Sequence, residues 1–115
     1  MFGLKESDIQ AILSVLADYA QVEQAFVFGS RAKGNYRPGS DVDIALKGLS
    51  ITFSTIQEIG FRLNEESLMP YKFDILNYNT IQNEALKSHI DRVGTCFYTK
   101  NPLIYSEDSN AIKQN

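Results

Sequence analysis

The sequence predicts a single α/β (α+β) domain in which helices pack against a small mixed β-sheet. Segments with apolar residues at helical spacing are interspersed with segments in which polar and apolar residues alternate, in the order helix, strand, strand, helix, strand, helix, strand. The chain has 115 residues, 43% hydrophobic and 22% charged, which suits one ordinary globular domain. A layered arrangement, with helices over at least one face of the sheet, accommodates this order most easily.

The first helix is predicted over residues 7–20, where apolar side chains recur at helical spacing. Ser7 with Gln10 can form a capping box at its start. Residues 22–28 are rich in β-forming residues and end at a Gly-Ser step, which indicates a strand followed by a tight turn. Residues 31–39 contain two glycines and a proline and are predicted to form a polar, basic loop.

The second strand is predicted over residues 41–46 because polar and apolar residues alternate there. Ser54 with Gln57 predicts the start of a second helix that runs to about residue 64, with Phe53 on its inner side. Residues 71–77 alternate again and form a third strand, which carries Asp74 on its polar face.

The last helix is predicted to begin at Asn79 or Thr80 and to end before Gly94. A short strand over residues 95–98 follows, in which Cys96 is interpreted as a small core residue. Phe26, Phe28, Phe61, Phe73 and Phe97 are predicted to lie mostly in the core. We therefore assign residues 1–99 to the domain and residues 100–115 to a polar C-terminal tail whose composition is compatible with disorder.

Charge and cysteine content restrict the class of protein. Eleven basic residues against fourteen acidic ones give a formal net charge of -3, which does not favour non-specific nucleic-acid binding, so an anionic ligand has to be held locally. The single cysteine, the absence of a basic and apolar leader, and apolar runs too short for a bilayer predict a soluble cytoplasmic protein.

Three aspartates are the candidate metal ligands. Asp41 and Asp43 are two residues apart in a predicted strand, so their side chains leave the same face with Cα atoms roughly 6 to 7 Å apart. Asp74 is a lone carboxylate in a strand that otherwise resembles core, where a cation or partner is needed to offset its charge. Carboxylates that converge beside phosphate oxygens are the ligands that Mg²⁺ prefers.

The segment before these carboxylates is suited to binding phosphate. Gly29 lets the backbone approach a ligand closely, and the N–H and hydroxyl groups of Ser30 can hold phosphate oxygens. Arg31 and Lys33, with Arg37, place three cations within seven residues. Ser40 is assigned to the same nucleotide-binding segment, where it orders the turn before the carboxylates.

Other side chains are predicted to be structural. No histidine lies near Ser40 in sequence to activate it as a nucleophile. The only histidine, His89, falls in the last helix and is interpreted as structural or solvent-exposed. Tyr36, in the loop, can shield the site or stack on a base.

Gly29-Ser30, ten further residues, Asp41-Val42-Asp43 and the later Asp74 resemble the signature of the polymerase-beta-type nucleotidyltransferase superfamily. The resemblance is to its minimal, MntA-like members and covers roughly residues 6–98. It implies the nucleotidyltransferase fold, with transfer of AMP from ATP to a hydroxyl acceptor and release of pyrophosphate. It also implies two Mg²⁺ ions, one held by all three aspartates and one held by Asp41 and Asp43.

Minimal members of this family are commonly paired with HEPN-type toxins, which implies that the acceptor is a tyrosine of such a partner and that the chain is an antitoxin in a hetero-oligomer. Two alternatives stay open. The chain can be a non-catalytic antitoxin or regulatory subunit that neutralises its partner by binding, or a transferase that modifies a small molecule such as an antibiotic.

Overall fold

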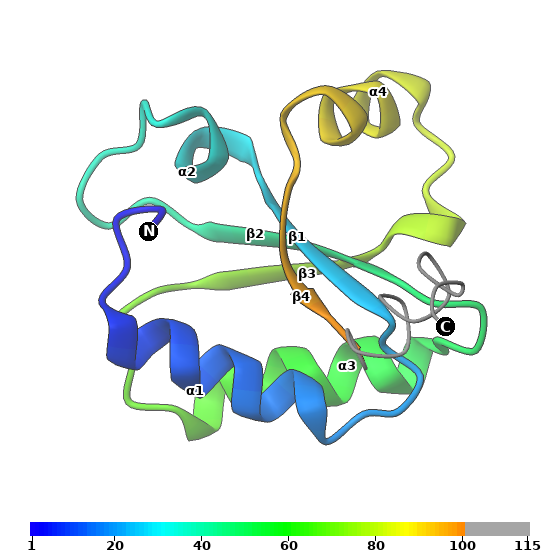
Figure 1. The fold of residues 1–115 in the computed structure, drawn as a ribbon, viewed down its shortest axis with the longest axis horizontal. Coiled ribbons are helices and arrows are strands. Elements are labelled where there is room, and N and C mark those ends of the chain that lie inside the picture. The colour runs from blue at the N-terminus through cyan, green and yellow to red at the C-terminus, as the bar shows by residue number, and fades with distance from the viewer. Residues whose placement is uncertain (101–115) are drawn as a thin grey trace, which may run out of the picture.

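The computed structural model describes residues 1–100, which form four helices and four strands (Figure 1). In chain order these are α1 (Glu6–Ala17), β1 (Gln24–Phe28), α2 (Gly29–Lys33), β2 (Val42–Lys47), α3 (Phe53–Phe61), β3 (Phe73–Asn77), α4 (Glu84–Val93) and β4 (Thr95–Thr99). A π-helical turn, Arg62–Glu66, extends α3, and a 3-10 turn, Tyr78–Thr80, follows β3. The predicted tail lies outside the described residues, except for Lys100. No helix in residues 1–100 combines the length and apolarity needed to cross a membrane.

The four strands form one mixed sheet in the order β3-β2-β1-β4. Strand β1 is antiparallel to both β2 and β4, whereas β2 and β3 are parallel. In this register Asp43 of β2 lies between Phe28 of β1 and Asp74 of β3. The predicted mixed sheet with packed helices is therefore confirmed.

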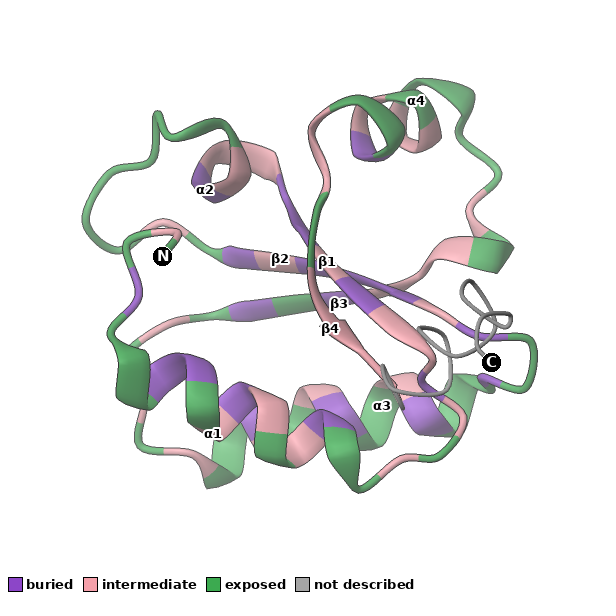
Figure 2. Cartoon of the chain, in the orientation of Figure 1, coloured by how far each residue is buried: buried purple, intermediate pink, exposed green. Residues whose placement is uncertain are grey.

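Helices cover the two faces of the sheet unequally (Figure 1). Helices α1 and α3 pack together on one face, and α2 and α4 lie on the other. Buried residues concentrate in the strands and on the sides of α1 and α3 that face them (Figure 2). The larger core lies on the face of α1 and α3 and includes Ile12, Leu16, Val22, Val27, Val42, Ile44, Leu46, Ile59 and Leu63. On the opposite face a smaller cluster of Phe28, Ala45 and Ile90 holds α4.

Two helices begin earlier than predicted because other residues cap them. The N–H of Lys5 donates to the carboxylate of Asp8 at 3.1 Å, so α1 begins at Glu6 and the predicted cap at Ser7 is wrong. The N–H of Thr55 donates to the side chain of Thr52 at 3.2 Å, so α3 begins at Phe53. Phe53 is the first residue of α3 and is 76% exposed, so the prediction that it lies on the inner side of the helix is wrong.

Helix α4 begins later than predicted, at Glu84. The side chain of Asn77 accepts the N–H of Asn79 at 3.1 Å and closes a 3-10 turn where the helix was expected to start. The N–H of Leu86 then donates to the side chain of Asn83 at 3.0 Å, which makes Asn83 the cap.

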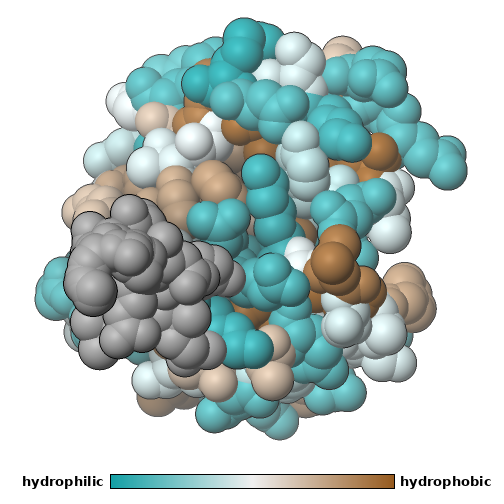
Figure 3. Space-filling model, turned by 45° about the vertical axis from the view of Figure 1, so that its right-hand side comes forward, coloured by the Kyte–Doolittle hydropathy of each residue, from teal (hydrophilic) through white to brown (hydrophobic). Residues whose placement is uncertain are grey.

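Two predicted core residues are exposed. Cys96 lies on β4, whose only neighbour in the sheet among residues 1–100 is β1, so within this part of the chain strand pairing covers it from one side alone. Phe61 is 56% exposed near the end of α3. Large apolar side chains are exposed elsewhere too, at Met1, Leu49 and Leu68. The face in Figure 3 is largely hydrophilic, with separate apolar patches between the polar side chains.

Candidate active site

Two of the three candidate carboxylates lie side by side on the sheet. Asp43 and Asp74 are paired residues of the parallel strands β2 and β3, so their side chains leave the same face from strands about 4.8 Å apart. Asp41 is exposed and lies two residues before Asp43, just outside β2. Since Phe28 is also paired with Asp43, the carboxylates share the face that α4 partly covers.

The carboxylates repel one another. Partial burial, followed by the neighbouring charges of Asp74 and Asp41, raises the pKa of Asp43 above its ordinary value. His89 opposes this shift to a smaller extent. The site therefore concentrates negative charge that a bound cation would relieve.

Gly29 brings the end of β1 against the carboxylate of Asp43. Its φ of +74° lies in the left-handed region, which favours glycine. A Cβ atom on Gly29 would lie closer than 3.0 Å to Oδ2 of Asp43. Both the backbone conformation and the nearby carboxylate oxygen therefore favour glycine, and the turn lies directly against the carboxylate.

A short helix, α2, replaces the first part of the predicted basic loop. It runs from Gly29 to Lys33 and is capped by Gly34, whose φ is +84° and whose N–H donates to the carbonyl of Ser30 at 2.9 Å. Lys33 and Arg37 are exposed. The sequence did not predict this helix because five residues are too few to show an apolar period.

Arg31 is buried, with 3% of its surface exposed. Its guanidinium donates from Nε and Nη2 to the carbonyl of Ser40, at 3.1 and 2.9 Å, and from Nη1 to the carbonyl of Phe2 at 2.9 Å. The rings of Tyr36 and Tyr71 each lie 5.1 Å from its central carbon. These contacts fasten the loop just before the metal-ligand candidates, and contact between Arg31 and a nucleotide stays a prediction.

Ser40 orders the same turn, as expected. Its hydroxyl accepts the N–H of Arg37 at 2.9 Å, and its own N–H donates to the carbonyl of Arg37 at 2.9 Å. Tyr36 is 38% exposed and packs on Arg31.

His89 is part of the site, which the sequence did not predict. Its Nε2 accepts the N–H of Gly29 at 3.2 Å, and its ring meets that of Phe28 edge to face, with centroids 6.1 Å apart. The two partners are separated by 60 residues. A lone histidine on a helix carries no sequence signal for such a contact.

The chemical type of the three candidate ligands suits magnesium. Asp41, Asp43 and Asp74 supply only carboxylate oxygens, which a hard cation prefers. Burial and then the charges of Asp74 and Asp41 raise the pKa of Asp43, and a bound cation would favour its ionised form. Within residues 1–100, no three acidic, histidine or cysteine side chains converge closely enough, in the rotamers present, to hold a metal. An ion held by all three carboxylates would therefore require rotation of at least one of these side chains, and Asp41 and Asp74 are both exposed to solvent.

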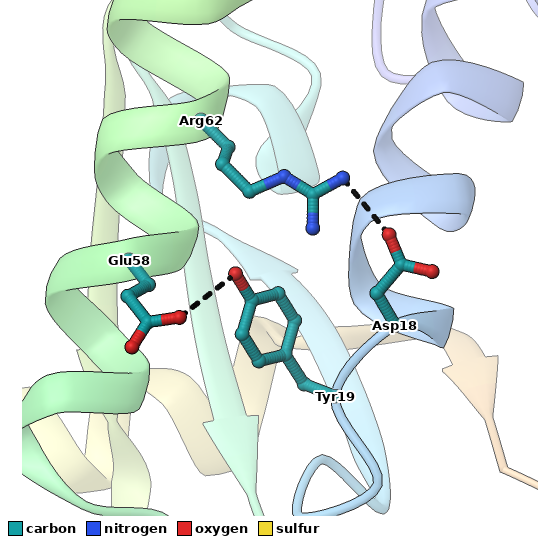
Figure 4. Close-up of polar contacts among 4 residues, drawn as sticks. All are labelled: Asp18, Tyr19, Glu58 and Arg62. Carbon is teal, nitrogen blue, oxygen red and sulfur yellow. Dashed lines mark hydrogen bonds and ion pairs between the residues drawn. The ribbon is translucent and has the colours of Figure 1, made fainter.

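The site is separate from a hollow of about 590 Å³ on the opposite side of the sheet. Tyr19, Glu58 and Arg62 contribute to its lining; the Tyr19 hydroxyl donates to Glu58 at 3.3 Å and Arg62 pairs with Asp18 at 2.9 Å (Figure 4). The hydroxyl, carboxylates and guanidinium there are engaged with one another, as Figure 4 shows. None of the three aspartates lines this hollow.

A mixed sheet with paired acidic residues on parallel strands, beside a glycine turn at the end of the next strand, defines a nucleotidyltransferase type of domain. The chain belongs to the polymerase beta nucleotidyltransferase family, whose model matches residues 10–103. It has the size and fold of a minimal member. Comparison with curated proteins gives no significant match.

Several solved structures of similar fold are toxin–antitoxin complexes. A toxin–antitoxin structure with AMP-PNP has a TM-score of 0.66 at 17% identity, covering 96% of this chain and 94% of that one. The MntA-HepT complex has a TM-score of 0.63 at 15% identity, with coverages of 96% and 93%. A tri-AMPylated HEPN toxin from Shewanella oneidensis in complex with MNT antitoxin gives 0.63 at 14% identity, with coverages of 95% and 86%. At these identities the likeness shows the shared fold.

Proposed function

We propose that this chain is a magnesium-dependent nucleotidyltransferase that transfers AMP from ATP to a tyrosine hydroxyl of a HEPN-type toxin and thereby acts as its antitoxin. The observation that carries the proposal is the pairing of Asp43 with Asp74 beside Gly29, in a chain of the nucleotidyltransferase family. Neighbours that match over nearly the whole of both chains are toxin–antitoxin complexes, which favours a protein acceptor. The single cysteine, unpaired among the described residues, is compatible with the cytoplasm, where we place the reaction.

The reaction needs the triphosphate and the acceptor hydroxyl to meet at the carboxylates. Asp41, Asp43 and Asp74 would hold one Mg²⁺ and Asp41 with Asp43 the second, and the ions would supply neutralisation of phosphate charge and acidification of the acceptor hydroxyl. The backbone N–H and hydroxyl of Ser30, in the turn that touches Asp43, would orient the phosphates.

The bonds exchanged are those of an in-line displacement at phosphorus. The acceptor oxygen bonds to the α-phosphorus, the bond from that phosphorus to the oxygen shared with the β-phosphate breaks, and pyrophosphate leaves. We assign the hydroxyl proton to the carboxylate of Asp74, which is exposed on the edge strand β3 and can pass it to solvent.

The test is intact mass spectrometry of both chains after incubation of the protein, ATP and Mg²⁺ with a co-expressed HEPN-type partner. We expect a gain of one or more AMP units on the partner, and its loss when Asp41 and Asp43 are both replaced by Asn. Asp18→Asn is the matched control, because Asp18 is an exposed aspartate whose partner Arg62 is remote from the site. Transfer by the double variant at the wild-type rate would show that the metal assignment is wrong.

A second candidate, an antitoxin that neutralises by binding alone, has one observation in its favour. The three carboxylates do not converge on a metal position in the rotamers that the described residues adopt. This candidate predicts that the partner mass stays unchanged with the wild type, and that the double variant still protects cells from the partner.

A further inference from the structure

The imidazole of His89, in α4, accepts a hydrogen bond from the glycine turn at the end of β1. The Gly29 N–H points to Nε2 of His89, at 3.2 Å. Gly29 is the first residue of α2, where N–H groups have no partner within the helix and need an acceptor from elsewhere. His89 supplies that acceptor from a distant part of the chain.

Packing keeps the imidazole of His89 in place. Its ring stands edge-on to that of Phe28, at an interplanar angle of 78°. The next residue, Ile90, is 3% exposed and forms the small core with Phe28 and Ala45. Because Phe28 and Ala45 belong to the central strands, the acceptor is fixed relative to the sheet that carries the carboxylates.

The hydrogen bond acts at the point where the turn and the carboxylate meet. It orients the peptide that joins Phe28 to Gly29, and Gly29 lies so close to Oδ2 of Asp43 that no Cβ fits between them. A change in the orientation of this peptide would move the start of α2 relative to Asp43.

We propose that His89 is a positioning residue, which sets the Gly29-Ser30 turn against Asp43 by accepting the Gly29 N–H. This inference rests on the proposed function, in which that turn orients the triphosphate and Asp43 binds metal. In this role His89 would contact neither the triphosphate nor the metal, and it acts on them through Gly29. Loss of the acceptor therefore misaligns the phosphates and the metal ligands while leaving each of them present.

Two variants separate the acceptor from the packing. His89→Phe keeps an aromatic ring against Phe28 but removes the acceptor, whereas His89→Gln removes the ring and places an amide oxygen at a similar reach. We expect His89→Phe to lower kcat for AMP transfer to the HEPN-type partner about tenfold, equivalent to about 1.4 kcal/mol, with KM for ATP changed less than twofold. His89→Gln is expected to retain most of the wild-type kcat.

Hydrogen exchange of the Gly29 amide gives a readout that does not depend on transfer. We expect this amide to be protected in the wild type and in His89→Gln, and to exchange at least tenfold faster in His89→Phe. A purely structural role predicts instead that His89→Phe lowers the melting temperature with kcat unchanged.

The outcomes distinguish this inference from the proposed function. If the wild type transfers nucleotide and His89→Phe matches it, or if the Phe and Gln variants lose activity equally, the positioning role is overturned. If the wild type transfers nothing, the proposed function fails, and protection of the Gly29 amide alone decides whether His89 holds the turn.

Discussion

Replacing Gly29 with alanine should damage function far more than stability. Both Gly29 and Gly34 have a positive φ, +74° and +84°, so alanine at either position is strained by about 1 to 2 kcal/mol, partly offset by about 0.4 to 1 kcal/mol from the stiffer unfolded chain. The expected net loss is about 1 kcal/mol for each variant. That corresponds to a fall in melting temperature of about 4 °C for a domain of this size.

The two variants differ in what the new methyl group meets. No atom of the described residues lies within 4 Å of a Cβ at Gly34, whereas at Gly29 the nearest atom is Oδ2 of Asp43. This carboxylate is the end of a rotatable side chain, so it can move by the roughly 1 Å needed at small cost in folding energy. Displacing a metal ligand by about 1 Å can cost on the order of 100-fold in rate.

Thermal unfolding and nucleotide transfer, measured on both variants, test this reasoning. We expect similar melting temperatures, near-normal transfer by Gly34→Ala, and a loss of about 100-fold in kcat/KM for Gly29→Ala. A wild-type kcat/KM in folded Gly29→Ala would refute the placement of Asp43 in the reaction. A much larger stability loss than in Gly34→Ala would refute the claim that the carboxylate can move aside.

Two further predictions concern the buried arginine and the charge of the site. Arg31→Met leaves the carbonyls of Ser40 and Phe2 without their donor and should lower the free energy of unfolding by about 2 to 4 kcal/mol in urea denaturation, whereas Lys33→Ala, at an exposed position, should change it by less than about 0.5 kcal/mol. Because the pKa of Asp43 is higher in the folded than in the unfolded chain, its ionisation destabilises the fold as the pH rises above about 3.9. Asp43→Asn should therefore melt at a higher temperature than the wild type at pH 7 without Mg²⁺, and at the same temperature near pH 3. Added Mg²⁺ should stabilise the wild type more than this variant; equal melting curves at pH 7 would contradict the electrostatic argument.

Much of the fold and of the carboxylate site follows from patterns that are local in sequence. The alternation of polar and apolar residues in β2 and β3 placed Asp43 and Asp74 on strands, and the order of elements indicated a mixed sheet with helices packed on it. Asp74 was chosen as a candidate ligand because a lone charge is costly in a strand that otherwise resembles core, and the register of β2 and β3 places it directly beside Asp43.

Contacts between distant segments could not be predicted in the same way. Arg31 looked like a phosphate ligand because its charge is visible in the sequence, while the carbonyl of Phe2 that binds it is 29 residues away. The partnership of His89 with Gly29 depends on the packing of α4, and the exposure of Cys96 depends on β4 being an edge strand. The starts of α3 and α4 were missed by a few residues because several Ser, Thr and Asn side chains lie near each cap, whereas at α1 the carboxylate of Asp8 accepts the Lys5 N–H in place of a cap at Ser7.

The division of the sheet into two faces has a consequence for how this chain can vary. The larger core, on the side of α1 and α3, contains none of the candidate metal ligands, and the acidic pair shares the opposite face with α4. Substitutions of one apolar residue by another of similar volume in this larger core should be tolerated, with effects confined to the abundance of the folded protein. Substitutions beneath α4 should instead alter turnover. Variants would therefore fall into two groups, one that changes abundance and one that changes turnover, and each could be optimised independently before the two are combined.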